Sequence, residues 1–270
     1  MHIGLHKTGT SAVQGIFINN KEYLYKNKIN YLVGFNICPS NENVEKVKNY
    51  FKNNVLENFT NIFSLEGYLE FPFFKKKQKE SSEFLNNIIS IFKELGIELV
   101  IILTLREQVS FSESYYLQLI KDGTINPEVS FDDFLKNILD LEKMDYLELI
   151  ENYKKYFDVK YLWYELLYQK NLKIFFNEFL KLVDIDNIDN INYSISKYLQ
   201  NVGLTKKDLP VFSRYKDTRH RKTLRKKFQQ INVPHYYKDI IKKEYKEFLK
   251  EKYQKSNNLL GLNKYNIKNE

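Results

Sequence analysis

The chain has 270 residues, 43% of them hydrophobic, and a formal net charge of +8, a balance that favours anionic ligands such as nucleotides or acidic glycans. A single cysteine, Cys38, excludes an internal disulfide, and the four scattered histidines exclude a zinc site of the usual Cys/His spacing. No apolar run approaches the ~20 residues that span a bilayer and no signal peptide opens the sequence, so we expect a cytoplasmic protein for which peripheral membrane contact stays open.

Short apolar segments alternate with longer amphipathic ones along the chain. Hydrophobic spacing predicts strands over residues 2–5, 29–33, 61–64, 99–103 and 159–163. The same spacing predicts helices over residues 11–26, 43–58 and 82–95, from Gln108 onward, twice within 130–157, and over 171–183. Gly96 stands where a C′ glycine ends a helix, and Ser130 with Asp133 has the spacing of a weak capping box.

The run from Leu99 to Leu103 contains no polar residue, which indicates a strand buried on both faces at the centre of a parallel sheet. Strands that alternate with helices predict a doubly wound, three-layer α/β fold with helices on both faces of the sheet. We therefore expect one domain over residues 1–270, in which residues 185–270 form a mainly helical, basic extension packed on the sheet. Ligands of such sheets bind at the carboxyl ends of the strands.

The segment HIGLHKTGTSAVQ near the start of the chain joins the first expected strand to the first expected helix. The N–H groups of such a loop and of the helix N-terminus converge on one spot, where the helix dipole favours negative charge, so we expect a P-loop-containing fold. A nucleoside-triphosphatase loop reads G-x-x-x-x-G-K-[ST]. Gly4 and Gly9 have that spacing and Ser11 is in place, but Thr10 stands where the lysine belongs. The lysine is Lys7, within the loop, and an ordinary turn before a helix is the alternative.

A second candidate lies at the end of the expected central strand. Arg106 closes that strand in LREQVSFSESYY, and Ser114 follows eight residues later, about two turns into the next helix. Both side chains can therefore reach one anion, with Ser110 and Ser112 as weaker candidates. The alternative is an arginine that caps the helix beside exposed serines.

Both segments resemble one family. HKTGTS resembles the 5′-phosphosulfate loop of sulfotransferases that use 3′-phosphoadenosine 5′-phosphosulfate (PAPS), most closely the bacterial carbohydrate-type members. The spacing R-x7-S resembles the 3′-phosphate motif of the same superfamily, and the two motifs occur in the expected order. A weaker resemblance to the later part of these proteins is found in three segments: VKYLWYELL, INYSISKYLQNVGL and LKEKYQKSNNLLGLNKY.

The resemblance implies a metal-independent sulfotransferase that moves a sulfuryl group from PAPS to a hydroxyl group of a glycan, for which a capsular or lipopolysaccharide sugar is favoured. In that family the lysine contacts the bridging oxygen of the leaving 5′-phosphate, while loop N–H groups and hydroxyls hold the phosphosulfate. The arginine and serine of the second motif hold the 3′-phosphate. The cofactor-binding residues that the resemblance implies are Lys7, Thr8, Gly9, Thr10, Ser11, Arg106 and Ser114.

A general base has to accept the proton of the attacking hydroxyl group. Glu66 is the first candidate, because it stands at the carboxyl end of a strand in SLEGY. His6, beside Lys7, is the second. Each has a structural alternative, since Glu66 fits a solvated loop acid and His6 a residue that shapes the loop.

Two other classes of function stay open. A P-loop kinase would need a lysine after Gly9 and a magnesium-binding acid, where the central strand instead ends in Thr104-Leu105-Arg106. A non-enzymatic protein could use the same scaffold to bind polyanions through the basic cluster of residues 213–228. Residues 213–228 could otherwise form a solvated helix. Alternatively, some of their basic side chains could cover the bound nucleotide or guide an acidic glycan to the site. No nucleic-acid module accompanies it, so nucleic acid is not an expected partner.

Overall fold

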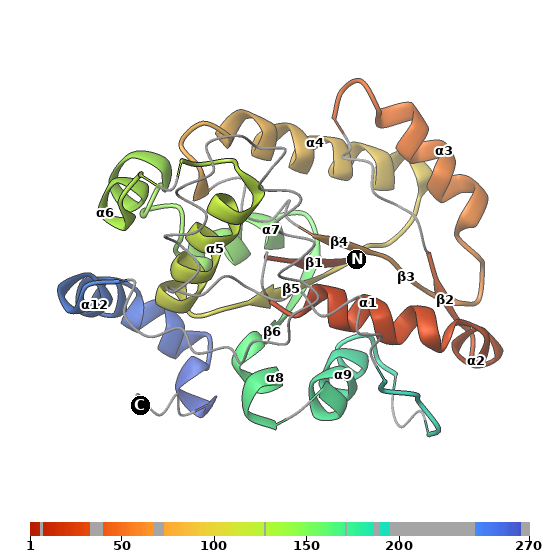
Figure 1. Ribbon diagram of the computed structural model, residues 1–270. Coiled ribbons are helices and arrows are strands. Elements are labelled where there is room, and N and C mark those ends of the chain that lie inside the picture. The colour runs from red at the N-terminus through yellow and green to blue at the C-terminus, as the bar shows by residue number, and fades with distance from the viewer. Residues whose placement is uncertain are drawn as a thin grey trace.

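The computed structural model describes residues 1–5, 8–32, 40–66, 73–126, 128–170, 172–185, 189–194 and 241–265. Within these ranges the chain has an α/β fold with a parallel sheet between helices (Figure 1). His6, Lys7 and the basic cluster of residues 213–228 lie outside the described residues. No described helix combines the length and the apolar character that a membrane crossing requires.

Four parallel strands form the main sheet, in the order β4 (Ser64–Glu66), β1 (His2–Gly4), β5 (Val100–Leu105) and β6 (Asp158–Trp163). In this register Gly4 lies between Glu66 of β4 and Thr104 of β5. Because all four strands are parallel, their carboxyl ends meet at one edge of the sheet. The segments that follow β1, β5 and β6 therefore start from the same edge.

Two further strands form a separate two-stranded sheet that adjoins the main sheet through the chain between β3 and β4. β2 (Ile29–Tyr31) pairs in parallel with β3 (Thr60–Ile62). Only Phe63 separates β3 from β4, and its carbonyl accepts a hydrogen bond from His2 N at 2.8 Å. Residues 60–66 therefore run as one extended stretch that pairs first with β2 and then with β1.

Helices cover both faces of the main sheet (Figure 1). One face is covered by α1 (Thr10–Asn19), α2 (Lys21–Lys26), α8 (Tyr164–Lys170) and α9 (Leu172–Lys181). The other face is covered by α3 (Val44–Asn54), α4 (Gln78–Leu95), α5 (Gln108–Asp122), α7 (Tyr146–Lys154) and α12 (Lys243–Leu259). Shorter helical segments are α6 (Phe131–Asp133), a π-turn (Phe134–Ile138) and a 3-10 turn (Leu262–Tyr265). The two helical layers bury two separate apolar clusters against the sheet.

The central strand is where the apolar run predicts it. β5 pairs with β1 on one side and β6 on the other, and its residues Ile101 to Leu105 are buried. The predicted stops and caps are also confirmed. Gly96 adopts a φ of 65° after α4, and the Ser130 hydroxyl accepts a hydrogen bond from Asp133 N at 3.1 Å.

The first helix differs from its prediction as one helix over residues 11–26. It breaks at Asn20, whose side-chain amide donates to the Ile16 carbonyl and whose side-chain oxygen accepts from Asn192 N. The expected helix over residues 43–58 already ends at Asn54, and α8 precedes the helix expected over 171–183. Of the expected extension over 185–270, the described part contains α12 and the 3-10 turn.

Candidate functional site

The connection from β1 to α1 winds tightly around Gly9. This residue has a φ of 79°, in the left-handed region, and its carbonyl accepts hydrogen bonds from Ala12 N at 2.9 Å and Val13 N at 3.1 Å. The Thr8 hydroxyl donates to the Leu5 carbonyl at 2.7 Å and so ties the turn to the end of β1. The N-terminus of a helix favours an anion through its dipole and its first N–H groups, and α1 presents such an end at this turn.

Two close approaches account for the two glycines of the loop. A Cβ atom on Gly4 would lie 2.0 Å from the Thr10 hydroxyl oxygen, so the start of α1 rests directly on β1. A Cβ atom on Gly9 would lie 2.6 Å from Leu167 of α8. The hydroxyl groups of Thr8 and Thr10 are buried and lie 3.4 Å apart, whereas Ser11 is half-buried. The threonine side chains are therefore buried within the turn, and Ser11 is the more exposed of its described hydroxyl-bearing residues.

Arg106 leaves the carboxyl end of β5 in a fixed position. Its guanidinium carbon lies 4.7 Å from the centre of the Tyr164 ring, and its Nε donates to the Ser110 hydroxyl at 3.0 Å. Its carbonyl accepts a hydrogen bond from the Tyr146 hydroxyl at 2.6 Å. The cap of α5 is Glu107, whose carboxylate accepts from the N–H groups at the start of that helix, so Arg106 is not the capping residue.

Tyr164 brings the loop and the arginine together. A Cβ atom on Gly9 would lie 3.7 Å from two carbon atoms of the Tyr164 ring, which also carries Arg106. The ring stands at the carboxyl end of β6, where α8 begins. The two motifs, far apart in the sequence, thus lie next to one aromatic ring. Sequence reasoning missed Tyr164, and its only signal is that it directly follows the strand in VKYLWYELL.

The serines after Arg106 differ in what they contact. Ser110 receives the Arg106 Nε hydrogen bond, although the sequence ranked it below Ser114. Ser114 lies one turn further along α5 and is 8% exposed. Ser112 is fully buried and donates to the Gln108 carbonyl at 2.7 Å. Ser110 and Ser114 are four residues apart in α5 and so lie on one face of the helix, and Arg106, which precedes the helix, reaches the first of them.

Glu66 ends β4 beside Gly4 and is half-buried. The structure therefore places this carboxylate at the same sheet edge as the β1–α1 turn, one strand away from it. His6, the second candidate for the base, and Lys7 are outside the described residues. The described site accordingly contains Glu66, the Gly9 turn, Arg106, the half-buried Ser110 and the buried Ser114.

Glu165 is a further acidic residue that the sequence did not single out. It is 8% exposed, and its Oε1 accepts a hydrogen bond from Glu107 N at 2.9 Å, while its Oε2 has no hydrogen-bond partner among the described atoms. Burial raises the pKa of its carboxyl group to about 7, and burial also raises the pKa of Glu107. Glu165 thus ties the end of β6 to the residue that follows Arg106.

Comparison with known proteins connects this chain to no established family. No family model matches the sequence, and no curated protein sequence matches it. What the site can do therefore follows from its own residues. These are a glycine turn at a helix N-terminus, an arginine held over a tyrosine ring, and a carboxylate at the neighbouring strand end.

Proposed function

We propose that the chain is a sulfotransferase that moves the sulfuryl group of PAPS to a hydroxyl group of a glycan. One observation supports this most, namely that the Gly9 turn and Arg106 lie next to the same ring, that of Tyr164. A nucleotide with anionic groups at its 5′ and 3′ positions needs two anion sites a short distance apart. A helix N-terminus and a fixed arginine are two such sites.

The proposed roles divide between the two sites. The backbone N–H groups of the turn, with Ser11, bind the 5′-phosphosulfate, and Lys7 acts on the oxygen that bridges sulfur and phosphorus. Arg106 binds the 3′-phosphate together with Ser110 and Ser114. Stacking on Tyr164 and the bond to Ser110 hold the guanidinium group in place before the nucleotide arrives, which lowers the cost of ordering it on binding.

The proposed reaction is an in-line displacement at sulfur. The glycan hydroxyl oxygen forms the new S–O bond, and the S–O bond to the 5′-phosphate breaks, so 3′,5′-ADP leaves with the electron pair. The hydroxyl proton passes to Glu66, the carboxylate at the end of β4. The protein contributes mainly by positioning the partners and by stabilising charge on the leaving oxygen, as in phosphoryl transfer.

The first test is thermal stabilisation by 3′,5′-ADP, compared with ATP in the presence and absence of magnesium. A ligand that binds only the folded state at ~100 times its Kd stabilises it by ~2.7 kcal/mol. We expect 3′,5′-ADP to raise Tm without magnesium. Arg106→Ala should lose most of this shift, and Arg106→Lys should not restore it, because lysine lacks the planar group that stacks on Tyr164.

Lys154→Ala is the matched control, since this exposed lysine of α7 pairs only with Glu151 on its own helix in the described contacts. It should keep the full shift. A rise in Tm with ATP and magnesium, but none with 3′,5′-ADP, would instead indicate a P-loop kinase. No rise in Tm with either nucleotide would favour a polyanion-binding scaffold. Either result contradicts the proposal.

Turnover tests the loop lysine separately from nucleotide binding. We expect Lys7→Ala to abolish transfer of labelled sulfate from PAPS to glycan acceptors, because the developing charge on the leaving oxygen loses its cation. The variant should unfold at the temperature of the wild type. Transfer at the wild-type rate in Lys7→Ala would show that this role is wrong.

A further inference from the structure

The carboxyl group of Glu165 is buried beside the candidate site, and only one of its oxygen atoms has a hydrogen-bond partner among the described atoms. The residue is 8% exposed, and its Oε1 accepts a hydrogen bond from Glu107 N at 2.9 Å. Its Oε2 is buried and has no such partner. A buried polar atom without a partner lowers stability whether the carboxyl group is protonated or ionised. This cost calls for an explanation, and a neighbouring ligand site can supply one.

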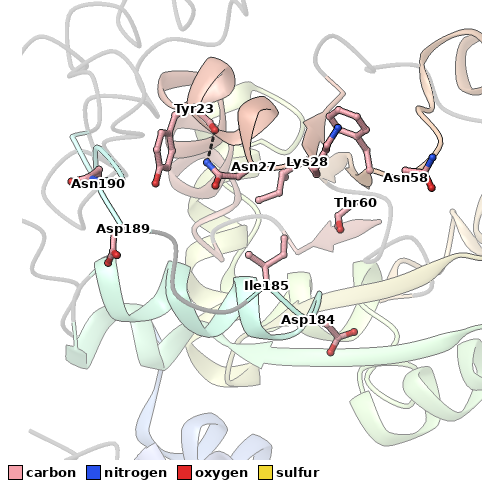
Figure 2. Close-up of a pocket in the computed structure, with 11 residues that line it drawn as sticks. Tyr23, Asn27, Lys28, Asn58, Thr60, Asp184, Ile185, Asp189 and Asn190 are labelled. Carbon is pink, nitrogen blue, oxygen red and sulfur yellow. Dashed lines mark hydrogen bonds between the residues drawn. The ribbon is translucent and has the colours of Figure 1, made fainter.

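An open hollow away from the candidate site shows the contrast (Figure 2). The hollow has a volume of about 760 Å³ and lies where β2 and β3 begin. Its described polar side chains, among them Asn58, Asp184 and Asn190, are exposed or half-buried, so water can satisfy them. The hollow therefore needs no ligand, whereas water does not reach the Oε2 atom of Glu165.

Glu165 holds the backbone of Arg106, while the residue before it holds the side chain. The peptide group that joins Arg106 to Glu107 is bound on both sides, because its N–H donates to Glu165 and its carbonyl accepts from the Tyr146 hydroxyl at 2.6 Å. The guanidinium carbon lies 4.7 Å from the centre of the Tyr164 ring. Tyr164 and Glu165 are consecutive residues after β6, so one short segment fixes both the backbone and the side chain of Arg106.

Hydrogen bonding decides which of the two buried carboxyl groups carries a proton. The oxygens of Glu107 accept N–H groups at the start of α5, from Val109 at 3.1 Å and Ser110 at 2.9 Å, which favours the charged form of Glu107. Glu165 accepts from one N–H group of Glu107, whose charge also disfavours a second charge beside it. Burial raises the pKa of Glu165 to about 7, so this carboxyl group changes its charge near neutral pH.

Two charges act on the Glu165 carboxyl group. Among the described residues, the ionisable groups that interact with it are those of Arg106, Glu107, Tyr146 and Tyr265. Burial raises the pKa of both tyrosines, so they stay uncharged near neutral pH. The charged partners are thus the Arg106 cation and the Glu107 anion. When Glu165 loses its proton, Arg106 faces two carboxylates instead of one and attracts a further anion less strongly.

We infer that Glu165 is a positioning residue for Arg106 whose carboxyl group takes up a proton from solvent when a nucleotide 3′-phosphate binds to that arginine. This inference rests on the proposed function, because it concerns the same nucleotide site. Two neighbouring negative charges repel each other, so the phosphate dianion favours the protonated carboxyl group, and the protonated carboxyl group favours phosphate binding. A nucleotide without a 3′-phosphate places no dianion at Arg106 and should leave the proton on Glu165 unaffected.

Isothermal titration calorimetry of the full chain with 3′,5′-ADP and with 5′-AMP tests this coupling. Titrations in two buffers that differ in ionisation enthalpy give the number of protons taken up on binding. At about pH 7.5 we expect the wild type to take up more protons with 3′,5′-ADP than with 5′-AMP. The affinity of the wild type for 3′,5′-ADP should fall at least about threefold from roughly pH 7 to pH 8.5.

Glu165→Gln imitates the protonated carboxyl group and keeps an oxygen that can accept from Glu107 N. This variant should take up no additional proton with 3′,5′-ADP, and at roughly pH 8.5 it should bind this nucleotide at least about threefold more tightly than the wild type. The loss of a purely structural residue would not produce a gain in affinity. Glu151→Gln is the matched control, because Glu151 is exposed on α7 and pairs with Lys154 of the same helix. It should behave as the wild type does.

Equal proton uptake by the wild type with the two nucleotides overturns the inference, and this comparison needs no variant. Proton uptake by Glu165→Gln equal to that of the wild type overturns it as well. If 3′,5′-ADP binds the wild type without this coupling, the proposed function stands and the inference alone is wrong. If 3′,5′-ADP does not bind the wild type, the proposed function is contradicted and the inference is overturned with it.

Discussion

His2 joins three strands of the sheet through one buried imidazole. Its Nδ1 lies 2.9 Å from the Ser64 hydroxyl of β4, and its Nε2 lies 2.8 Å from the Thr104 hydroxyl of β5. The Phe179 ring meets it edge-on at 5.0 Å. Burial lowers the pKa of this imidazole to about 3, so it stays neutral in the folded protein at neutral pH.

This buried histidine predicts a loss of stability in acid. Its folded pKa of about 3 lies below the usual 6.5, so the unfolded chain takes up the proton first as the pH falls. The free energy of unfolding should therefore decrease from pH 6.5 towards pH 3, by up to ~1.4 kcal/mol per pH unit from this residue, and not change above pH 6.5 on its account. Urea unfolding between pH 7 and pH 4 measures the slope.

His2→Asn supplies the comparison, because other groups that titrate in acid remain in both proteins. The variant should be less stable at pH 7, where it loses the bonds to Ser64 and Thr104, yet lose less stability on acidification. An equal slope in both proteins would mean that His2 is protonated in the folded state at its ordinary pKa.

Among the site residues, motif spacing in the sequence identifies only those that belong to one continuous segment of the chain. Gly4 and Gly9 are explained by close approaches in the β1–α1 turn, and Arg106 stands at the predicted strand end. Tyr164 and Glu165 could not be found in this way. They reach the site from the end of β6, and only the pairing of β6 with β5 brings them to Arg106.

The β1–α1 turn depends on its glycine more than an ordinary helix end does. Gly9→Ala places a side chain at a φ of 79° and 2.6 Å from Leu167, so we expect it to lower the free energy of unfolding by about 2–4 kcal/mol. Gly96→Ala is the matched control. Gly96 also has a positive φ, of 65°, but nothing lies within 4 Å of the added Cβ atom, so it should cost only about 1–2 kcal/mol.

The difference between the two variants measures the packing of the turn against α8. Chemical denaturation of both proteins gives the two free energies, and 3′,5′-ADP should stabilise Gly96→Ala but not Gly9→Ala. Equal costs for the two substitutions would show that α8 yields to the added methyl group.

Elements with a strong local signal are predicted well. The apolar run of β5, the glycine stop after α4 and the Ser130 cap each depend on residues within one segment. The break between α1 and α2 depends instead on Asn20, whose side chain binds the backbone of Asn192, far along the chain. Helical spacing continues through this residue, so the sequence pattern contains no sign of the break.

At the scale of the whole molecule, α12 and the residue after it form hydrogen bonds with residues at the ends of β5 and β6, from outside the sheet. The side-chain amides of Gln108 and Asn257 exchange hydrogen bonds of 3.2 Å and 2.7 Å, and the Trp163 indole donates to the Leu260 carbonyl at 2.9 Å. These bonds connect α12 and its cap residue Leu260 to Gln108, two residues after Arg106, and to Trp163, which directly precedes Tyr164. The candidate site is thus supported by the C-terminal part of the chain as well as by the sheet.

Stability of the whole fold should also respond to pH through Glu165, with the opposite sign to His2. Its folded pKa of about 7 lies above the usual 4.5, so the folded protein retains a proton that the unfolded chain has already lost. The free energy of unfolding should therefore fall as the pH rises from 4.5 to 7, by up to ~1.4 kcal/mol per pH unit, and this loss should be complete above pH 7. Burial also raises the pKa of Glu107, and the positive charge of Arg106 offsets part of the rise for both carboxyl groups.

Glu165→Gln removes this titration and keeps an oxygen that can accept from Glu107 N. We expect the variant to lose less stability than the wild type between pH 5 and pH 8 in urea unfolding, while Glu148→Gln, an exposed residue of α7, follows the wild type. If Glu165→Gln shows the wild-type decline, Glu165 is ionised throughout this range. Because Glu165 lies beside the proposed 3′-phosphate site, a bound dianion should keep its proton in place, so 3′,5′-ADP should bind the wild type more weakly at pH 8 than at pH 6.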